Sequence, residues 1–176
     1  MTVELEIASA VAAPPVAVWA VIARLGGVND ELRPWCTMRG SASLHARGLE
    51  SWVPGERASC WLLAGGVLPF DRHHFGFESI EPGVGFVEES TSWQQRRWRH
   101  QRTLTEVDGG TLIADHLTIE PRLRPAEPLV RWIVGRLFAH RHRRLAERFG
   151  AVRPPDRSTG PDRSTGPDRS TWEAEP

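Results

Sequence analysis

A long amphipathic segment at residues 125–150 follows an extended stretch of strand-like sequence and constrains the fold more than any other feature. Its apolar side chains recur three and four residues apart, as on one face of a helix: Leu129, Val130, Ile133, Val134, Leu137, Phe138, Leu145 and Phe149. Arginines occupy much of the remainder, and Pro125, Pro128 and Gly150 are typical of helix ends. The sequence therefore predicts one long C-terminal helix.

Five strand-like runs precede this helix and are mostly separated by turn residues, such as Asp108-Gly109-Gly110. They cover residues 57–64, 72–80, 85–92, 96–107 and 111–121. A long terminal helix can lie across such an antiparallel meander only if the sheet curves around it, and that geometry commonly leaves a cavity. We therefore predict an α+β fold with a hollow between sheet and helix.

The N-terminal part of the chain predicts a strand followed by helices. Residues 2–12 alternate between apolar and polar, and Pro14-Pro15 suit the first turn of a helix that ends at residue 24 or 25, before Gly26-Gly27. A short helix is predicted at residues 28–34 and a strand near residues 37–43. The two prolines also interrupt the apolar run at residues 7–23, so we predict no membrane insertion and no signal peptide.

Composition excludes several kinds of chemistry. The chain has 176 residues, which fits one domain, and a formal net charge of zero, so no global field selects a polyanion. All basic residues are arginine and tyrosine is absent, so neither a Schiff-base lysine nor a tyrosine acid can exist. Cys36 and Cys60 form no pattern for a metal or a disulfide framework, and a reducing cytoplasm is the expected location.

The C-terminal tail has a different composition. The sequence Pro-Asp-Arg-Ser-Thr-Gly begins at Pro155 and is repeated from Pro161 and, in part, from Pro167. Such a repeat carries no apolar residue that could offset the entropy lost on ordering. We therefore predict a domain over residues 1–150 and a disordered tail over residues 151–176.

The order of these elements, together with several local motifs, resembles the START-like superfamily, often called SRPBCC proteins. The motifs are Trp19 in the first helix, Trp98-Arg99-His100, the stretch from Gly110-Thr111 to Asp115, and Phe138 to Leu145 in the closing helix. The superfamily includes Bet v 1-like proteins, polyketide cyclases and aromatase/cyclases, and lipid-transfer domains. The resemblance covers roughly residues 3–149 and implies a helix-grip fold, in which a curved sheet of about seven strands holds the last helix around a ligand cavity.

Alternation along residues 96–107 predicts which side chains enter that cavity. Trp98, His100, Arg102 and Leu104 share one face, and the apolar members make it the inward one. His100 could then move a proton, and Arg102 could hold a ligand carbonyl or carboxylate. Ile133 and Leu137 of the closing helix are predicted to line the same space.

The turn at Asp108-Gly109 decides the partner of Arg102. A two-residue turn places Arg102 opposite Asp115 as a buried ion pair, whereas one residue more places it opposite His116. Both alternatives remain open in the sequence. With the two-residue turn, Arg102 and Asp115 could simply neutralise one another and hold the sheet together, because burying either charge alone would be costly.

Two further polar groups are candidates for the cavity. Asp71 and His73 share a face and could act as an oriented base, or they could anchor a loop at the rim, while the adjacent His74 points away. Glu88, on the face of Phe86, is a candidate interior carboxylate with a raised pKa.

These observations leave three hypotheses for function. The first is a binding or carrier protein for a small hydrophobic or amphipathic molecule, such as a lipid, polyketide or isoprenoid-like compound. The second is a cyclase- or dehydratase-like enzyme that uses a cavity histidine and Arg102, and the third is an interaction module that uses the arginine-rich end of the last helix. No metal, cofactor or nucleic acid is predicted, and a homodimer is left open.

Overall fold

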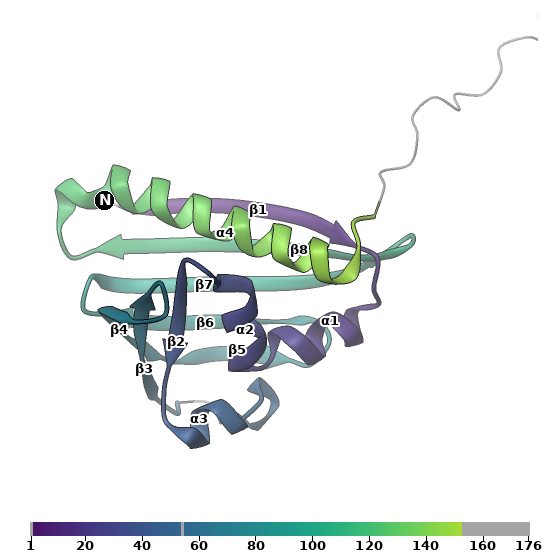
Figure 1. Ribbon diagram of the computed structural model, residues 1–176, viewed down its shortest axis with the longest axis horizontal. Helices are drawn as coiled ribbons and strands as arrows, with labels where there is room; N and C mark the ends of the chain where they lie inside the picture. Colours follow the sequence, from purple (N-terminus) through teal and green to yellow (C-terminus); the bar gives the residue numbers. More distant parts are fainter. Residues whose placement is uncertain (1, 54, 153–176) are drawn as a thin grey trace, which may run out of the picture.

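The computed structural model describes residues 2–53 and 55–152, except the side chain of Arg124 (Figure 1). The predicted disorder of the tail therefore lies, from residue 153 onward, outside the described residues. Within them, no helix is long and apolar enough to span a membrane.

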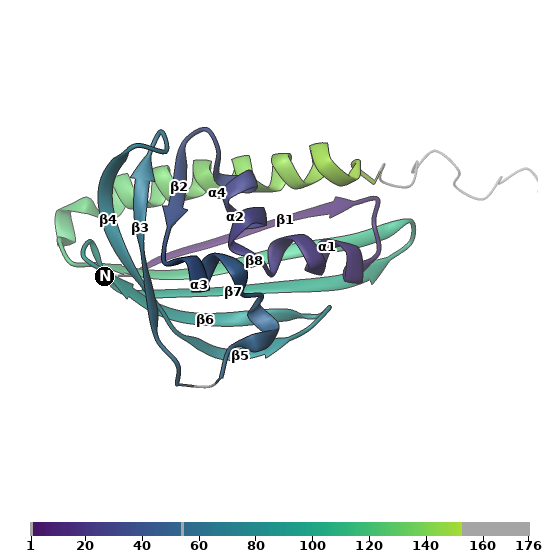
Figure 2. The same cartoon turned by 60° about the horizontal axis from the view of Figure 1, so that its bottom comes forward.

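An antiparallel sheet forms the body of the molecule, and seven of its strands follow one continuous path. In spatial order they are β1 (Val3–Val11), β8 (Gly110–Pro121), β7 (Gln95–Val107), β6 (Gly85–Ser92), β4 (Leu68–Phe75), β3 (Ala58–Ala64) and β2 (Cys36–Arg39). An eighth strand, β5 (Phe77–Glu81), pairs with β6 outside this path. The sheet curls so that β2, β3 and β4 rise toward the last helix, as Figure 2 shows.

The long helix α4 (Glu127–Phe149) lies along β1 and packs against α2 (Leu25–Leu32). The other helical segments are α1 (Pro15–Ile22), α3 (Ala42–Ala46) and the 3-10 turns η1 (Leu49–Ser51) and η2 (Arg124–Ala126). The predicted α+β helix-grip architecture, with a curved sheet around a C-terminal helix, is confirmed.

Three apolar clusters hold these layers together. One joins α1 to β7, β8 and the end of α4, a second joins β1 and β8 to the middle of α4, and a third lies beneath α3. Phe138 belongs to the second cluster and is 1% exposed. The clusters fix α4 over the β1 side of the sheet, while the part of the interior between them contains the cavity described below.

The buried face of α4 differs from the predicted one. Val134, Phe138 and Leu145 are buried, whereas Leu129 and Ile133 are 57% and 45% exposed. The reason is that α4 meets β1 and α2 along a stripe that also includes buried charged residues, which a count of apolar residues does not detect. Trp132 in the N-terminal half of the helix is also 62% exposed, whereas Val130 is half-buried against the second cluster.

Two smaller predictions about element boundaries were wrong. Gly26-Gly27 does not end the first helix but lies inside α2, where a Cβ on Gly27 would stand 2.0 Å from the carbonyl oxygen of Val21. Glycine is therefore needed for close packing of α1 on α2. The run at residues 72–80 is two strands, β4 and β5, separated at Gly76.

The turn between β7 and β8 has the shorter of the two predicted lengths. Val107 pairs with Gly110, and Gly109 has a φ of 78°, which suits a tight two-residue turn. Arg102 consequently lies opposite Asp115, and the alternative pairing with His116 is excluded.

Candidate functional site

A cavity of about 310 Å³ lies between the curved sheet, α2 and the N-terminal part of α4. Most of its wall is apolar, with several aromatic rings: Trp52, Phe70, Phe75, Phe77, Phe86, Trp98 and Phe138. Phe70 on β4 and Ile133 on α4 both line it and are each 45% exposed, so the lining includes side chains in contact with solvent. This is the size range and lining expected of a small-molecule site.

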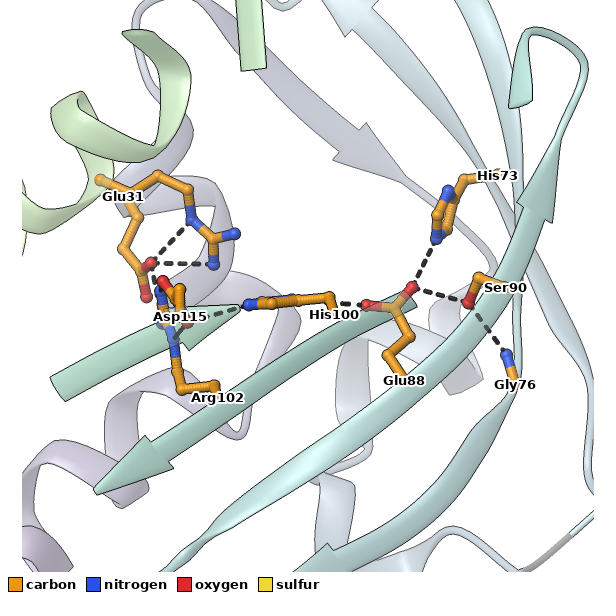
Figure 3. Close-up of polar contacts among 9 residues, drawn as sticks. Glu31, His73, Gly76, Glu88, Ser90, His100, Arg102 and Asp115 are labelled. Atoms are coloured by element: carbon orange, nitrogen blue, oxygen red, sulfur yellow. Dashed lines mark hydrogen bonds and ion pairs between the residues drawn. The ribbon is translucent and has the colours of Figure 1, made fainter. Parts of the chain in front are cut away.

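A row of buried polar side chains crosses one wall of the cavity (Figure 3). At one end, His73 Nε2 lies 2.7 Å from Glu88 Oε1, which also accepts a hydrogen bond of 2.6 Å from Ser90. The backbone N–H of Gly76 donates to the Ser90 hydroxyl at 3.2 Å. The β4–β5 break at Gly76 thus fixes the carboxylate that orients His73.

His100 occupies the middle of the row. Its Nε2 lies 2.9 Å from Asp115 Oδ1, and its Nδ1 faces Glu88 Oε2 at 3.7 Å. Alternation on β7 places the ring inward, and the register of β6, β7 and β8 aligns the three residues across neighbouring strands. A neutral imidazole has one N–H, so only the charged ring can donate to both carboxylates.

Arg102 forms the other end of the row with carboxylates from two elements. Its Nε and Nη2 donate to Asp115 at 2.7 and 2.6 Å, and its Nη1 donates to Glu31 of α2 at 3.2 Å. Arg141 of α4 also binds Glu31, and His142 Nε2 lies 3.0 Å from Asp115 Oδ2. The row therefore connects the sheet to both helices that cover it.

The charges in this row stabilise one another. Burial alone would raise the pKa of Asp115, but the Arg102 guanidinium and His100 outweigh burial and hold that pKa well below its usual range. Burial lowers the pKa of Arg102, and the carboxylates of Asp115 and Glu31 more than reverse this, so the pKa is raised. Both groups are thus charged at neutral pH.

Glu88 does not have the raised pKa predicted from its burial. Burial does favour the neutral acid, but the nearby His100 ring, 3.7 Å away, and the hydrogen-bonded His73 outweigh it, and the pKa is lowered. Glu88 is therefore an ionised acceptor and does not serve as an interior acid.

A family model described as a domain of unknown function, DUF8410, matches residues 9–149. The chain belongs to this family. No curated protein matches it.

Solved structures show that this DUF8410 member shares its fold with START-like proteins. Zhui aromatase/cyclase from Streptomyces sp. R1128 has a TM-score of 0.64 at 13% identity and is matched over 86% of this chain and 100% of its own. A protein from Chromobacterium violaceum has a TM-score of 0.64 at 13% identity and is matched over 85% of this chain and 99% of its own. A START superfamily protein from Mycobacterium smegmatis has a TM-score of 0.55 at 11% identity and is matched over 84% of this chain and 96% of its own. The recognised START-like fold is confirmed, and at these identities the likeness concerns the fold alone.

Most of the predicted site residues of this DUF8410 chain line the cavity. They are Asp71, His73, Glu88, Trp98, His100, Arg102, Ile133 and Leu137. Asp115 lies behind Arg102, outside the lining, and Leu104 is packed in the apolar cluster beneath α1. Leu104 therefore packs in the core of the fold, outside the cavity lining.

Asp71 is not the partner of His73, although both side chains are buried on the same face of β4. Its carboxylate accepts a hydrogen bond of 2.7 Å from Ser92 and one of 3.3 Å from the backbone N–H of Gln94. It thus anchors the turn between β6 and β7, which is the second of the two predicted roles. Glu88 takes the position beside His73.

Sequence reasoning missed Glu31, Arg141 and His142. Arg141 carried a detectable signal, because it falls between Phe138 and Leu145 on the buried stripe of α4, where an apolar residue is expected. Glu31 carried none, since its role depends on where α2 crosses α4.

The site offers no evident place for a metal or a thiol nucleophile. No group of three metal-ligating side chains suited to an ion occurs among the described residues. Cys36 and Cys60 are buried and unpaired, and burial together with Glu88 and Asp71 raises the pKa of Cys60 to about 12. A neutral thiol of this kind is a poor nucleophile.

Proposed function

We propose that this protein binds a small hydrophobic or amphipathic molecule in the cavity beneath α4. The observation that carries the proposal is the cavity itself, about 310 Å³ in volume, with aromatic walls and one polar row. Apolar walls supply most of the binding free energy, and a few fixed polar groups orient the ligand. Lipid, polyketide and isoprenoid-like compounds all have this character.

The relatives of the fold support the same kind of function. One of the solved structures with this fold is an aromatase/cyclase, and another is a START superfamily protein. The third hypothesis, an interaction module with a filled interior, has less support, because the interior is hollow and Arg144 and Arg148 bind Glu147 and Asp30. A cytoplasmic location and a homodimer stay predictions.

Nucleic-acid binding also has little support from the strand arginines. Arg97 and Arg99 of β7 are paired with Glu89 of β6, and Arg99 also contacts Glu78. Guanidinium groups that are already matched in this way offer little attraction to phosphates.

Native mass spectrometry of the purified protein, combined with titration of the neutral dye Nile red, tests the binding function. We expect a co-purifying small molecule or, in its absence, saturable dye fluorescence with one site per chain. A protein that carries no ligand and binds neither Nile red nor any other apolar probe would contradict the proposal.

A second candidate function, proton-transfer catalysis, is favoured by the geometry of His73. Its Nε2 is held by ionised Glu88, and its Nδ1 forms no hydrogen bond with a described residue although the ring lines the cavity. A carboxylate that is hydrogen-bonded to one imidazole nitrogen holds the ring in place, and the other nitrogen can then act as an oriented base. His100 is less suited to this role, because both its nitrogens face carboxylates.

Proton exchange at a ketone tests this second function. We expect the protein in deuterium oxide to speed replacement of the methyl protons of methyl naphthyl ketone, and His73→Gln to lose most of that rate. His116→Gln, on the exposed side of β8, is the matched control. Equal rates for the wild type and His73→Gln would remove His73 as the base, and no rate above buffer would remove this candidate function.

A further inference from the structure

We propose that the ligand is a neutral, oxygen-bearing molecule whose carbonyl or hydroxyl oxygen accepts a hydrogen bond from Arg141, and that free carboxylates are excluded. This inference rests on the proposed binding function and specifies its ligand class. It depends on a free donor, on the balance of buried charge and on a free acceptor.

The free donor is Nη1 of Arg141. Nε and Nη2 of this guanidinium both lie 2.9 Å from Glu31 Oε2, whereas Nη1 donates to no described residue. Arg141 is 7% exposed and lines the cavity, and its guanidinium stands 4.7 Å from the centre of the Phe138 ring. Two anchored nitrogens and a ring face hold Nη1 in place, and its N–H groups are free to donate to a ligand acceptor.

The balance of buried charge favours a neutral acceptor. Four carboxylates are buried in the described part of the chain, namely Glu31, Asp71, Glu88 and Asp115, against two buried guanidinium groups, Arg102 and Arg141. The buried carboxylates thus outnumber the buried guanidinium groups, and neither buried arginine lacks a carboxylate partner. A ligand carboxylate would have to leave water without a counter-charge, which is costly.

The two other arginines in the wall do not change this balance. Arg47 is paired with Glu56, and the side chain of Arg24 is exposed to solvent at the rim. Glu31 Oε1 also remains buried without a hydrogen-bond partner among the described residues. The carboxylate beside Arg141 therefore already has an unused acceptor, and a ligand carboxylate would add more acceptors there.

A free acceptor points to the same ligand class. Gln95 lines the cavity, and its Oε1 is buried without a hydrogen-bond partner among the described residues. This oxygen would attract a ligand hydroxyl and repel a carboxylate. A donor at Arg141 and an acceptor at Gln95 thus suit a molecule that bears carbonyl and hydroxyl groups and no charge.

Calorimetric titration with four probes that share a naphthalene skeleton tests the inference. They are ethylnaphthalene, methyl naphthyl ketone, naphthoate and a naphthylethyl ammonium salt. We expect the ketone to bind about tenfold more tightly than the hydrocarbon, as for a hydrogen bond to a charged donor. Naphthoate should bind more weakly than the hydrocarbon, because its charge meets no unmatched guanidinium group, and tighter binding of the ammonium salt than of the ketone would overturn the neutral ligand class.

Two substitutions attribute the preference to Arg141. Arg141→Met removes the donor, and Arg141→Lys keeps a positive charge beside Glu31 but lacks the third fixed N–H. Both should bind the ketone and the hydrocarbon about equally. Arg136→Met, an exposed arginine on the same helix, is the matched control and should keep the wild-type preference. If Arg141→Met fails to fold, the lysine variant and the wild-type series still decide the question.

The outcomes distinguish this inference from the function on which it rests. Equal binding of ketone and hydrocarbon by the wild type, tighter binding of naphthoate, or an unchanged preference in Arg141→Lys would overturn the ligand class and leave the binding function standing. Failure of all four probes, the hydrocarbon included, would overturn both.

Discussion

Asp115 illustrates how single residues hold this interior together. Its carboxylate is 2% exposed and lies within 3.0 Å of nitrogens from His100, Arg102 and His142. These partners come from β7 and α4, so one side chain connects the sheet to the covering helix. A buried ion pair such as Arg102–Asp115 adds little net stability compared with an apolar core, but its disruption leaves a charge buried and unmatched.

Replacing Asp115 should therefore destabilise the protein strongly. We expect Asp115→Asn to lower the free energy of unfolding by about 3–5 kcal/mol, because Arg102 loses its buried counter-charge and the two histidines lose a hydrogen-bond partner. Urea denaturation measures the change. Glu106→Gln, which alters an exposed carboxylate on β7, should stay within about 0.5 kcal/mol of the wild type. A small loss for both variants would show that the buried charge is matched in another way.

The lowered pKa values of Asp115 and Glu88 give stability a defined dependence on acid. Near pH 4 the unfolded chain takes up protons at these groups while the folded protein does not, so unfolding becomes easier as pH falls. We expect the free energy of unfolding to drop between about pH 5 and 3, by up to about 1.4 kcal/mol per pH unit for each group. Glu88→Gln should show a shallower drop in urea titrations across this range, and an unchanged slope would contradict the assignment.

The residues of the site could be predicted only where local rules determine them. Strand alternation and the tight turn at Asp108 give the inward direction of His100 and one of the two possible partners of Arg102. The roles of Glu31 and Arg141 depend on the crossing of α2 over α4, which no local pattern contains. The error about the Glu88 pKa has the same origin, since burial was predictable and the two histidine partners were not.

At the scale of elements, α4 is divided along its length. Its middle and C-terminal part bury Val134, Phe138 and Leu145, whereas Leu129 and Trp132 near its start are 57% and 62% exposed. The apolar spacing predicted the helix, but its orientation follows from charged residues that face inward. The structural roles of Gly76 and Gly27 could likewise not be predicted from the sequence, because glycine occurs both in turns and where two elements pack closely.

Substitutions along α4 should follow this division. Phe138→Ala is expected to cost about 3–5 kcal/mol of unfolding free energy, since it removes a fully buried ring that packs on His100 and Trp98. Leu129→Ala should change it by less than about 0.5 kcal/mol, because the side chain is already in water. Chemical denaturation of both variants compares their losses of unfolding free energy directly. A comparable loss at Leu129 would mean that the exposed end of α4 packs against something in solution.

At the scale of the whole molecule, the buried row and the cavity depend on each other. The row ties α2, α4 and four strands together, so the sheet and helices are held apart at a fixed distance and the apolar walls do not collapse. Ridges of apolar side chains alone would tend to close such a space. The fold could be recognised from the order of elements, whereas the volume of the cavity depends on these tertiary contacts.

A bulky side chain at the cavity wall should separate binding from folding. Leu137 lines the cavity from α4 and is half-buried, so Leu137→Trp places a ring in space that is empty in the wild type. We expect Nile red affinity to fall by more than about tenfold, while the free energy of unfolding changes by less than about 1 kcal/mol, because the open side of the cavity accommodates the extra atoms. Leu112→Trp, at a 36% exposed position of β8 away from the cavity, is the control and should bind the dye as the wild type does. If Leu137→Trp keeps full affinity, the dye binds elsewhere, and the cavity beneath α4 is not the binding site.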